Sequence, residues 1–317
     1  MKERILIGLV CLLCLAACGP KKHSEAVPQA RTFPLEVIPI MIEEPQQRVT
    51  WLVQHYWDSF TAPDSLYFSD SLHINGVLSE EVEKQMGTYA TLLQQVTPES
   101  GVKAMERLFT RMEAFQKAHP SGNLFEELNS LVAKYFYDPN SPVRSEQLYL
   151  PYVRLMAGSE LVSAPQRQRY EWEAKTCALN LPGSPAADFT FVDTKGQKRT
   201  LYSIQADLTL LIFGNPDCRA CREIQQSIAA SEALSKAIQN GQLKVVDIYI
   251  DEDITIWKAR VPDYPTNWIN GYDPDFVIRT DLLYNVRALP SLYLLDKEKT
   301  VLLKDCTPDQ FFRALGL

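Results

Sequence analysis

The sequence predicts a multidomain α plus α/β protein, in which a helical N-terminal domain precedes a C-terminal domain of strands and helices. Apolar side chains recur at helical spacing between about residues 48 and 169, whereas short continuous apolar runs, typical of buried strands, follow residue 181. The chain has 317 residues, which is enough for two domains of ordinary size. A hydrophobic content of 46% indicates a folded chain.

The N-terminal end has the pattern of a bacterial export signal. A charged start is followed by an apolar run from Ile5 to about Ala17, which is too short to span a bilayer comfortably. Its end, LAAC, resembles the lipobox of bacterial lipoproteins, in which the signal is cut before an acylated cysteine. The resemblance implies a signal peptide over 1–17, a lipidated Cys18 and attachment to a lipid bilayer. Gly19 after the cysteine favours the outer over the inner membrane, on the periplasmic side of the cell envelope.

Residues 18–33 are polar and lack helical periodicity, so we expect a tether between the lipid and the folded body. The chain carries a net charge of −7, and no cluster of basic residues extends beyond Lys21-Lys22. This charge pattern gives no sign of a nucleic-acid partner.

The helical domain is expected over 34–177. Ser79 is a candidate N-cap with acidic residues in the first turn. The apolar positions behind it that share one helix face are Val82, Met86, Tyr89, Leu93 and Val96. The same rhythm recurs over 102–115 and 124–135, which predicts four to six packed helices.

The C-terminal domain is expected over 178–317. Its predicted order is strand, helix, strand, insertion, strand, strand, helix. The predicted strands are the apolar runs 208–215, 243–251, 289–296 and 301–305. One helix is expected from the cysteines to about residue 240 and another from Thr307-Pro308 to the end. Threonine followed by proline is a favoured helix start.

The strongest motif is Cys218-Arg-Ala-Cys221, which lies where a buried strand gives way to a helix. With Pro290 ahead of a later strand, this order resembles the thioredoxin fold. The lead-in GSPAADFTFVDTKGQKRTLYSI and the long insertion resemble the TlpA/redoxin branch of exported thiol:disulfide oxidoreductases. The N-terminal part is similar to a helical domain of unassigned function found in some bacterial lipoproteins. The thioredoxin-like resemblance covers about residues 180–317.

The resemblance implies a role for each residue of the motif. A helix N-terminus favours the thiolate, so Cys218 is expected to be the nucleophile and Cys221 the resolving thiol. Leu289 and Pro290 are expected to bind the substrate segment. Flanking the nucleophile, Arg219 should favour its thiolate and Asp217 should oppose it.

One departure concerns the proton of the resolving thiol. Thioredoxin carries a buried acid six residues before its first cysteine, and Ile212 occupies that position here. Proton transfer at Cys221 therefore requires another group or water.

The function implied is a lipid-anchored enzyme that reduces disulfides of client proteins. Its partners would be client thiols and disulfides and a membrane electron donor of the thiol-transfer type, and no cofactor is implied. Oxidase and isomerase activity remain open, as do the client, the role of the helical domain and the oligomeric state.

The cysteines allow two alternative functions and leave one question of pairing. A zinc site normally needs about four ligands. Cys11 and Cys14 lie in the predicted signal peptide, and the rest of the chain offers one close pair and so two ligands. A binding module with a purely structural disulfide is the stronger rival. Cys177 and Cys306 could be separate buried thiols or a second disulfide, which the sequence leaves open.

Overall fold

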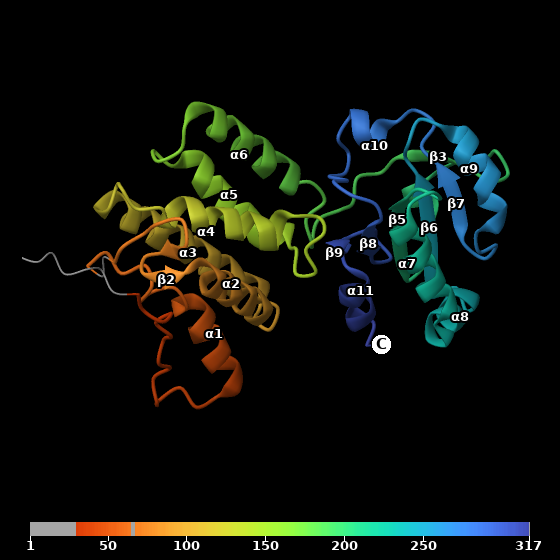
Figure 1. The fold of residues 1–317 in the computed structure, drawn as a ribbon. Helices are drawn as coiled ribbons and strands as arrows, with labels where there is room; N and C mark the ends of the chain where they lie inside the picture. Colours follow the sequence, from red (N-terminus) through yellow and green to blue (C-terminus); the bar gives the residue numbers. More distant parts are fainter. Residues whose placement is uncertain (1–29, 65–66, 317) are drawn as a thin grey trace, which may run out of the picture.

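A computed structural model describes residues 30–64 and 67–316, and it contains a helical N-terminal part beside a C-terminal part built on one mixed sheet (Figure 1). This arrangement confirms the predicted fold class. The N-terminal elements are α1 (Pro45–His55), β1 (His73–Ile74), β2 (Val77–Leu78), α2 (Ser79–Leu93), α3 (Pro98–Ala118), α4 (Leu124–Val132), the π-helical turn η1 (Ala133–Tyr137), α5 (Glu146–Gly158) and α6 (Ala164–Cys177). The predicted signal peptide and Cys18 lie outside the described residues.

The helices of the N-terminal part enclose one apolar core. Val82, Met86, Tyr89 and Leu93 of α2 are buried in it, as their spacing predicted. Ser79, the candidate N-cap, is instead the first residue of the helix. Leu78 is the N-cap residue, and its side chain makes no capping hydrogen bond. The short hairpin of β1 and β2 just before α2 was not predicted. No helix in the described ranges is long and apolar enough to cross a membrane.

The end of the predicted tether packs on this core. Phe33 is buried against Trp57 at 5.4 Å between ring centroids, and the Arg31 amide donates to the Gly76 carbonyl at 2.8 Å. The folded body of the protein therefore starts a few residues before residue 34.

The C-terminal part is a seven-stranded sheet in the order β4-β3-β7-β6-β5-β8-β9. Its elements are β3 (Thr190–Asp193), β4 (Lys198–Thr200), η2 (Leu201–Ser203), β5 (Leu208–Gly214), α7 (Arg219–Ala230), α8 (Glu232–Gln239), β6 (Leu243–Tyr249), α9 (Ile254–Arg260), η3 (Val261–Asp263), β7 (Ile269–Tyr272), α10 (Val277–Thr280), β8 (Ser291–Leu295), β9 (Val301–Cys306) and α11 (Pro308–Ala314). Strands β5, β6 and β7 are parallel, and β8 runs antiparallel to β5.

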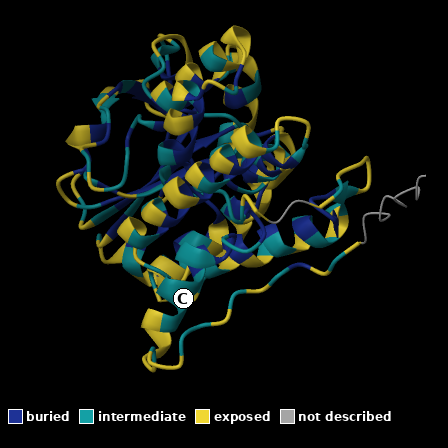
Figure 2. Cartoon of the chain, turned by 90° about the vertical axis from the view of Figure 1, so that its left-hand side faces the viewer, coloured by how far each residue is buried: buried dark blue, intermediate teal, exposed yellow. Residues whose placement is uncertain are grey.

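Both faces of the sheet are covered, which explains the continuous apolar run of β5 (Figure 2). Leu210 and Ile212 pack with α7, α8 and α11, while Leu211 and Phe213 pack in the core of the opposite face. Every strand residue from 209 to 214 is buried, so no polar alternation is expected.

Three details differ from the predicted order of elements. The antiparallel strands β3 and β4, which precede β5, were not among the predicted strands. The helix after the cysteines is broken at Ser231, which has an extended backbone and whose hydroxyl accepts from the Leu234 amide to cap α8. The insertion contributes β7, which extends the sheet beyond β6. The last helix starts as predicted, with Thr307 in a capping box with Gln310.

Candidate functional site

Cys218 is the N-cap residue of α7, at the carboxyl end of the central strand β5. Its sulfur accepts the backbone N–H of Cys221 at 3.2 Å, one of the helix donors that have no partner within the helix. The turn before it is held by Asn215, whose carbonyl accepts the Cys218 amide at 3.1 Å. A partly exposed sulfur at a helix N-terminus is arranged to act as a thiolate nucleophile.

Cys221 is one turn further into α7 and is 1% exposed. Burial raises the pKa of the Cys221 thiol well above its ordinary value, and the hydrogen bond with Cys218 raises it further. A buried thiol of this kind needs a proton acceptor before it can react. It is placed to attack only the sulfur beside it, as a resolving thiol does.

The segment ahead of β8 closes the other side of the site. Leu289 and Pro290 are joined by a cis peptide bond. The Cys218 thiol donates to the Leu289 carbonyl, with 3.5 Å between sulfur and oxygen. The structure thus brings Cys218 and Cys221 together with Leu289, which is 71 residues from Cys218 in the sequence.

Both residues that were expected to tune the thiolate lie at the surface. The Arg219 side chain is 87% exposed and its Nε donates to Glu223 at 2.7 Å, so its charge is paired on the surface. Asp217 is exposed beside the turn, where its amide donates to the Asn215 side chain at 2.8 Å.

A buried carboxyl that the sequence analysis missed lies next to Cys221. Asp247 on β6 is 2% exposed, and burial raises its pKa to about 7, with a hydrogen bond from Gln225 opposing this shift. A β-carbon at Gly214 would lie 3.2 Å from Asp247 Oδ1 and 4.0 Å from the Cys221 sulfur. In the β5–β6 register Asp247 pairs with Ile212, the position that lacks the expected acid. The sequence signal was a single charged residue inside the strand LKVVDIY.

A cavity of about 580 Å³ lies beside the acid, on the side of the insertion. Its lining includes Asp217, Gln225 and Tyr264. Gln225 Nε2 donates to Asp247 Oδ2 at 2.8 Å, so the wall of the cavity contacts the buried carboxyl directly. Gln225 therefore stands between the cavity and Asp247.

The other two cysteines are buried thiols in different cores, Cys177 in that of the helical part and Cys306 beside the sheet. Burial raises the pKa of Cys306 to about 12, which disfavours its thiolate. Among the described residues, no group of three or more His, Cys, Asp or Glu side chains could hold a metal ion.

Comparisons with known proteins cover both parts of the chain. The family described as "Domain of unknown function (DUF5106)" matches residues 17–179. A thioredoxin-like protein from Bacteroides caccae is similar over 91% of this chain and 99% of its own, with 34% identity and a TM-score of 0.78. No curated protein matches the chain.

Two further solved structures match less than half of the chain. The C-terminal domain of an uncharacterized protein from Bacteroides fragilis is 43% identical, covers 44% of this chain and 99% of its own, and has a TM-score of 0.42. A domain of a possible thiol-disulfide isomerase from Cytophaga hutchinsonii is 26% identical, covers 44% of this chain and 93% of its own, and has a TM-score of 0.37.

Proposed function

We propose that this chain is a thiol:disulfide oxidoreductase that reduces disulfides of client proteins. The chain belongs to the thioredoxin-like proteins and carries a DUF5106 domain ahead of its thioredoxin fold. The observation that carries the proposal is the contrast between its paired thiols. Cys218 is partly exposed at a helix N-terminus, and Cys221 is buried one turn further on, with its backbone N–H donating to the Cys218 sulfur at 3.2 Å.

The reaction is a two-electron exchange in two steps. The Cys218 thiolate attacks a client disulfide, a mixed disulfide forms, and the departing client sulfur takes up a proton. Cys221 then transfers its proton to the Asp247 carboxylate and attacks the Cys218 sulfur, which releases the second client sulfur as a thiolate that is protonated. The enzyme ends as the Cys218–Cys221 disulfide. A dithiol donor, which we propose to be a membrane electron carrier, must reduce it again.

The test is to trap the intermediate. Cys221→Ser leaves the nucleophile but removes the resolving thiol, so mixed disulfides with client proteins should accumulate and disappear on reduction. Cys218→Ser should trap none, and Cys306→Ser, which changes a buried thiol outside the pair, should behave like the wild type. If Cys221→Ser traps no more than Cys218→Ser, the pair is structural.

The direction of exchange is tested by the reduction potential of the pair. A midpoint near about −270 mV, as in thioredoxin, supports a reductant, whereas one near about −120 mV means an oxidant of client thiols. The fraction of disulfide is measured by mass after alkylation in graded thiol buffers. A pair that never reduces would refute exchange in either direction.

We further propose that the chain is exported and anchored to the periplasmic side of a bacterial membrane through an acylated Cys18. Gly19, the residue after this cysteine, favours the outer membrane. The support is the LAAC sequence that ends the apolar run. Several acyl chains would give stable anchoring, which a single chain does not. Replacing Cys18 with serine should abolish labelling by a fatty acid and release the protein from the membrane fraction. Continued labelling would contradict the assignment.

A further inference from the structure

The segment that leads into Leu289 is held by residues outside the thioredoxin fold. Residues 283–291 connect α10 to β8 and contain the Leu289–Pro290 bond. At the start of the segment, the Leu283 carbonyl accepts from the side chain of Asn180, just after α6, at 2.6 Å. Within it, the Arg287 guanidinium carbon lies 4.2 Å from the ring centroid of Tyr137 in η1.

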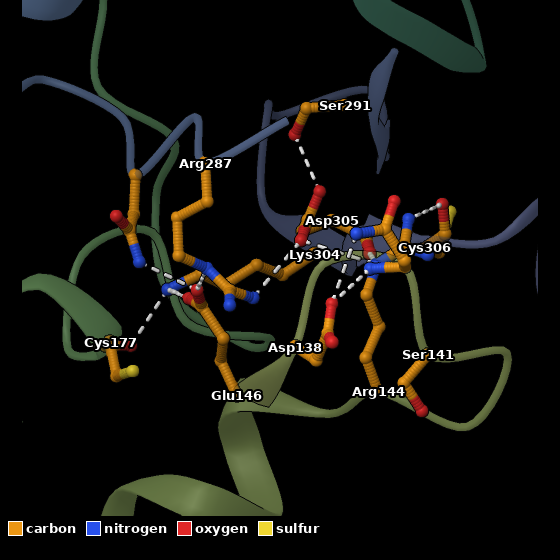
Figure 3. A network of polar contacts seen from close by, with 12 residues as sticks. Asp138, Ser141, Arg144, Glu146, Cys177, Arg287, Ser291, Lys304, Asp305 and Cys306 are labelled. Atoms are coloured by element: carbon orange, nitrogen blue, oxygen red, sulfur yellow. Dashed lines mark hydrogen bonds and ion pairs between the residues drawn. The ribbon is translucent and has the colours of Figure 1, made fainter. Parts of the chain in front are cut away.

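Glu146, the first residue of α5, is the central contact from the helical domain (Figure 3). One carboxylate oxygen accepts from Asn285 Nδ2 at 2.6 Å and from Arg287 Nε at 2.9 Å. The other oxygen lies 2.7 Å from Lys304 Nζ on β9. The Glu146 side chain is 2% exposed, and such buried, charge-assisted contacts are stronger and more directional than surface pairs.

Arg144, two residues before Glu146, reaches the far end of the segment through Asp305 (Figure 3). Its Nε donates to Asp305 Oδ2 at 3.3 Å, and the other Asp305 oxygen accepts from the Ser291 hydroxyl at 2.7 Å. Ser291 directly follows Pro290. The helical domain thus fixes the chain on both sides of Leu289, through Asn285 and Arg287 before it and Ser291 after it.

We propose that Arg144 and Glu146 are positioning residues, which hold the Leu289–Pro290 segment in place against Cys218 from the neighbouring domain. The helical domain of unknown function then acts as a rigid support for the surface that binds the client's extended chain. This inference rests on the proposed function for its effect on clients. Its structural half, that the helical domain fixes the segment, can be measured without any client.

Hydrogen exchange tests the structural half. In Glu146→Gln, which keeps the side chain's size and one carbonyl oxygen, the amides of residues 283–291 should exchange roughly tenfold faster, while those of β5 and β6 keep their protection. The control is Tyr152→Phe, which removes a 3.1 Å hydrogen bond to Asn129 inside the same helical domain without touching the segment. Equal exchange of the segment in both variants would overturn the inference.

Kinetics with a peptide disulfide test the effect on clients. Glu146→Gln and the milder Asn285→Ala should raise KM roughly tenfold with a smaller change in kcat, because a misplaced binding segment weakens client binding. Retained protection of the β5 and β6 amides in the exchange experiment shows that each variant is folded. A KM no higher than in Tyr152→Phe refutes the positioning role. A wild-type protein that exchanges no disulfide refutes the proposed function instead.

Discussion

At the scale of single residues, Asp247 determines how the proton of Cys221 can leave. Its carboxyl occupies the strand position beside Ile212, so the acid reaches the thiol from β6 instead of β5. With a pKa raised to about 7, it is ionised above neutral pH and can then accept a proton. Cys221 keeps its proton until such a base is available because burial raises the pKa of its thiol.

Asp247→Asn is expected to slow the resolution of a mixed disulfide by about 100-fold, the size of a typical general-base effect. In the wild type this rate should rise with pH through about 7, where Asp247 ionises, and in the variant that rise should vanish. The rate of resolution is measured by single-turnover release of a labelled peptide from Cys218, followed from pH 5 to 9. An unchanged pH profile would assign proton transfer to water.

The same substitution should also change how the free energy of unfolding depends on pH, in a direction set by the raised pKa of Asp247. A carboxyl whose pKa is raised by folding binds more protons in the native than in the unfolded state between about pH 4 and 7. The contribution of Asp247 to wild-type stability therefore falls as pH rises across this range. Asp247→Asn lacks this loss, so its stability relative to the wild type should increase from pH 4 to 7, as urea unfolding of the reduced proteins would measure.

Not every site residue had a local sequence signal. Cys218, Cys221 and Leu289-Pro290 could be found because the motif, the strand before it and the proline are each short patterns. Asp247 could be located only by strand register, which pairs residues that are far apart in the chain. The pairing of Arg219 with Glu223 was not predicted, although the two residues are four apart on the helix expected from the cysteines onward.

At the scale of elements, the sheet depends on close contact between β3 and β7. A β-carbon at Gly271 of β7 would lie 2.6 Å from the Phe191 ring and 2.9 Å from the Val192 carbonyl oxygen. The backbone atom cannot move aside without disturbing the strand pair. The glycine is therefore required where the insertion joins the sheet, a contact that its sequence NWINGYD did not indicate.

Gly271→Ala is expected to destabilise the protein by about 1–3 kcal/mol, as overpacking of a dense core does. Gly158→Ala is a matched control, because a β-carbon there would meet nothing within 4 Å at the end of α5. Chemical denaturation of both variants measures the difference. Equal stability would show that β3 and β7 can separate without cost.

Other features of the elements followed directly from the sequence. The Thr307 capping box and the buried face of α2 were both predictable from residue type and spacing. The break at Ser231 was not predicted, although the spacing of six from Ile228 to Leu234 departs from the spacing of three or four on one helix face. A serine that caps a new helix competes with the helix it interrupts, and only packing decides between the two.

At the scale of the whole molecule, the two domains share a buried set of charges. Glu146 of one domain lies between Arg287 and Lys304 of the other, whose side chains are 12% and 3% exposed. Nothing in the sequence indicated the Glu146–Arg287 pair, which is separated by 141 residues. The fold class of the two domains was therefore predicted correctly, but the contacts that join the domains were not predicted.

Glu146→Ala is expected to cost about 3–5 kcal/mol, because it leaves two buried cations without their shared carboxylate. Glu232→Ala removes an exposed pair with Lys236 at 2.7 Å and should cost less than about 1 kcal/mol. Urea unfolding of both variants gives the comparison. Similar losses would mean that water reaches the Glu146 site.

The segment that connects the two domains is hydrogen-bonded to the chain along the edge of the sheet. The Lys304 ammonium donates to the Cys177 carbonyl at 2.7 Å, the Gly183 amide donates to the Val301 carbonyl at 2.8 Å, and the Ala186 amide donates to the Lys299 carbonyl at 2.9 Å. A protease must draw several extended residues into its cleft, and residues paired in this way resist it. Limited digestion of the native protein should therefore spare the junction between the helical and thioredoxin-like domains, so that the two are recovered as one fragment.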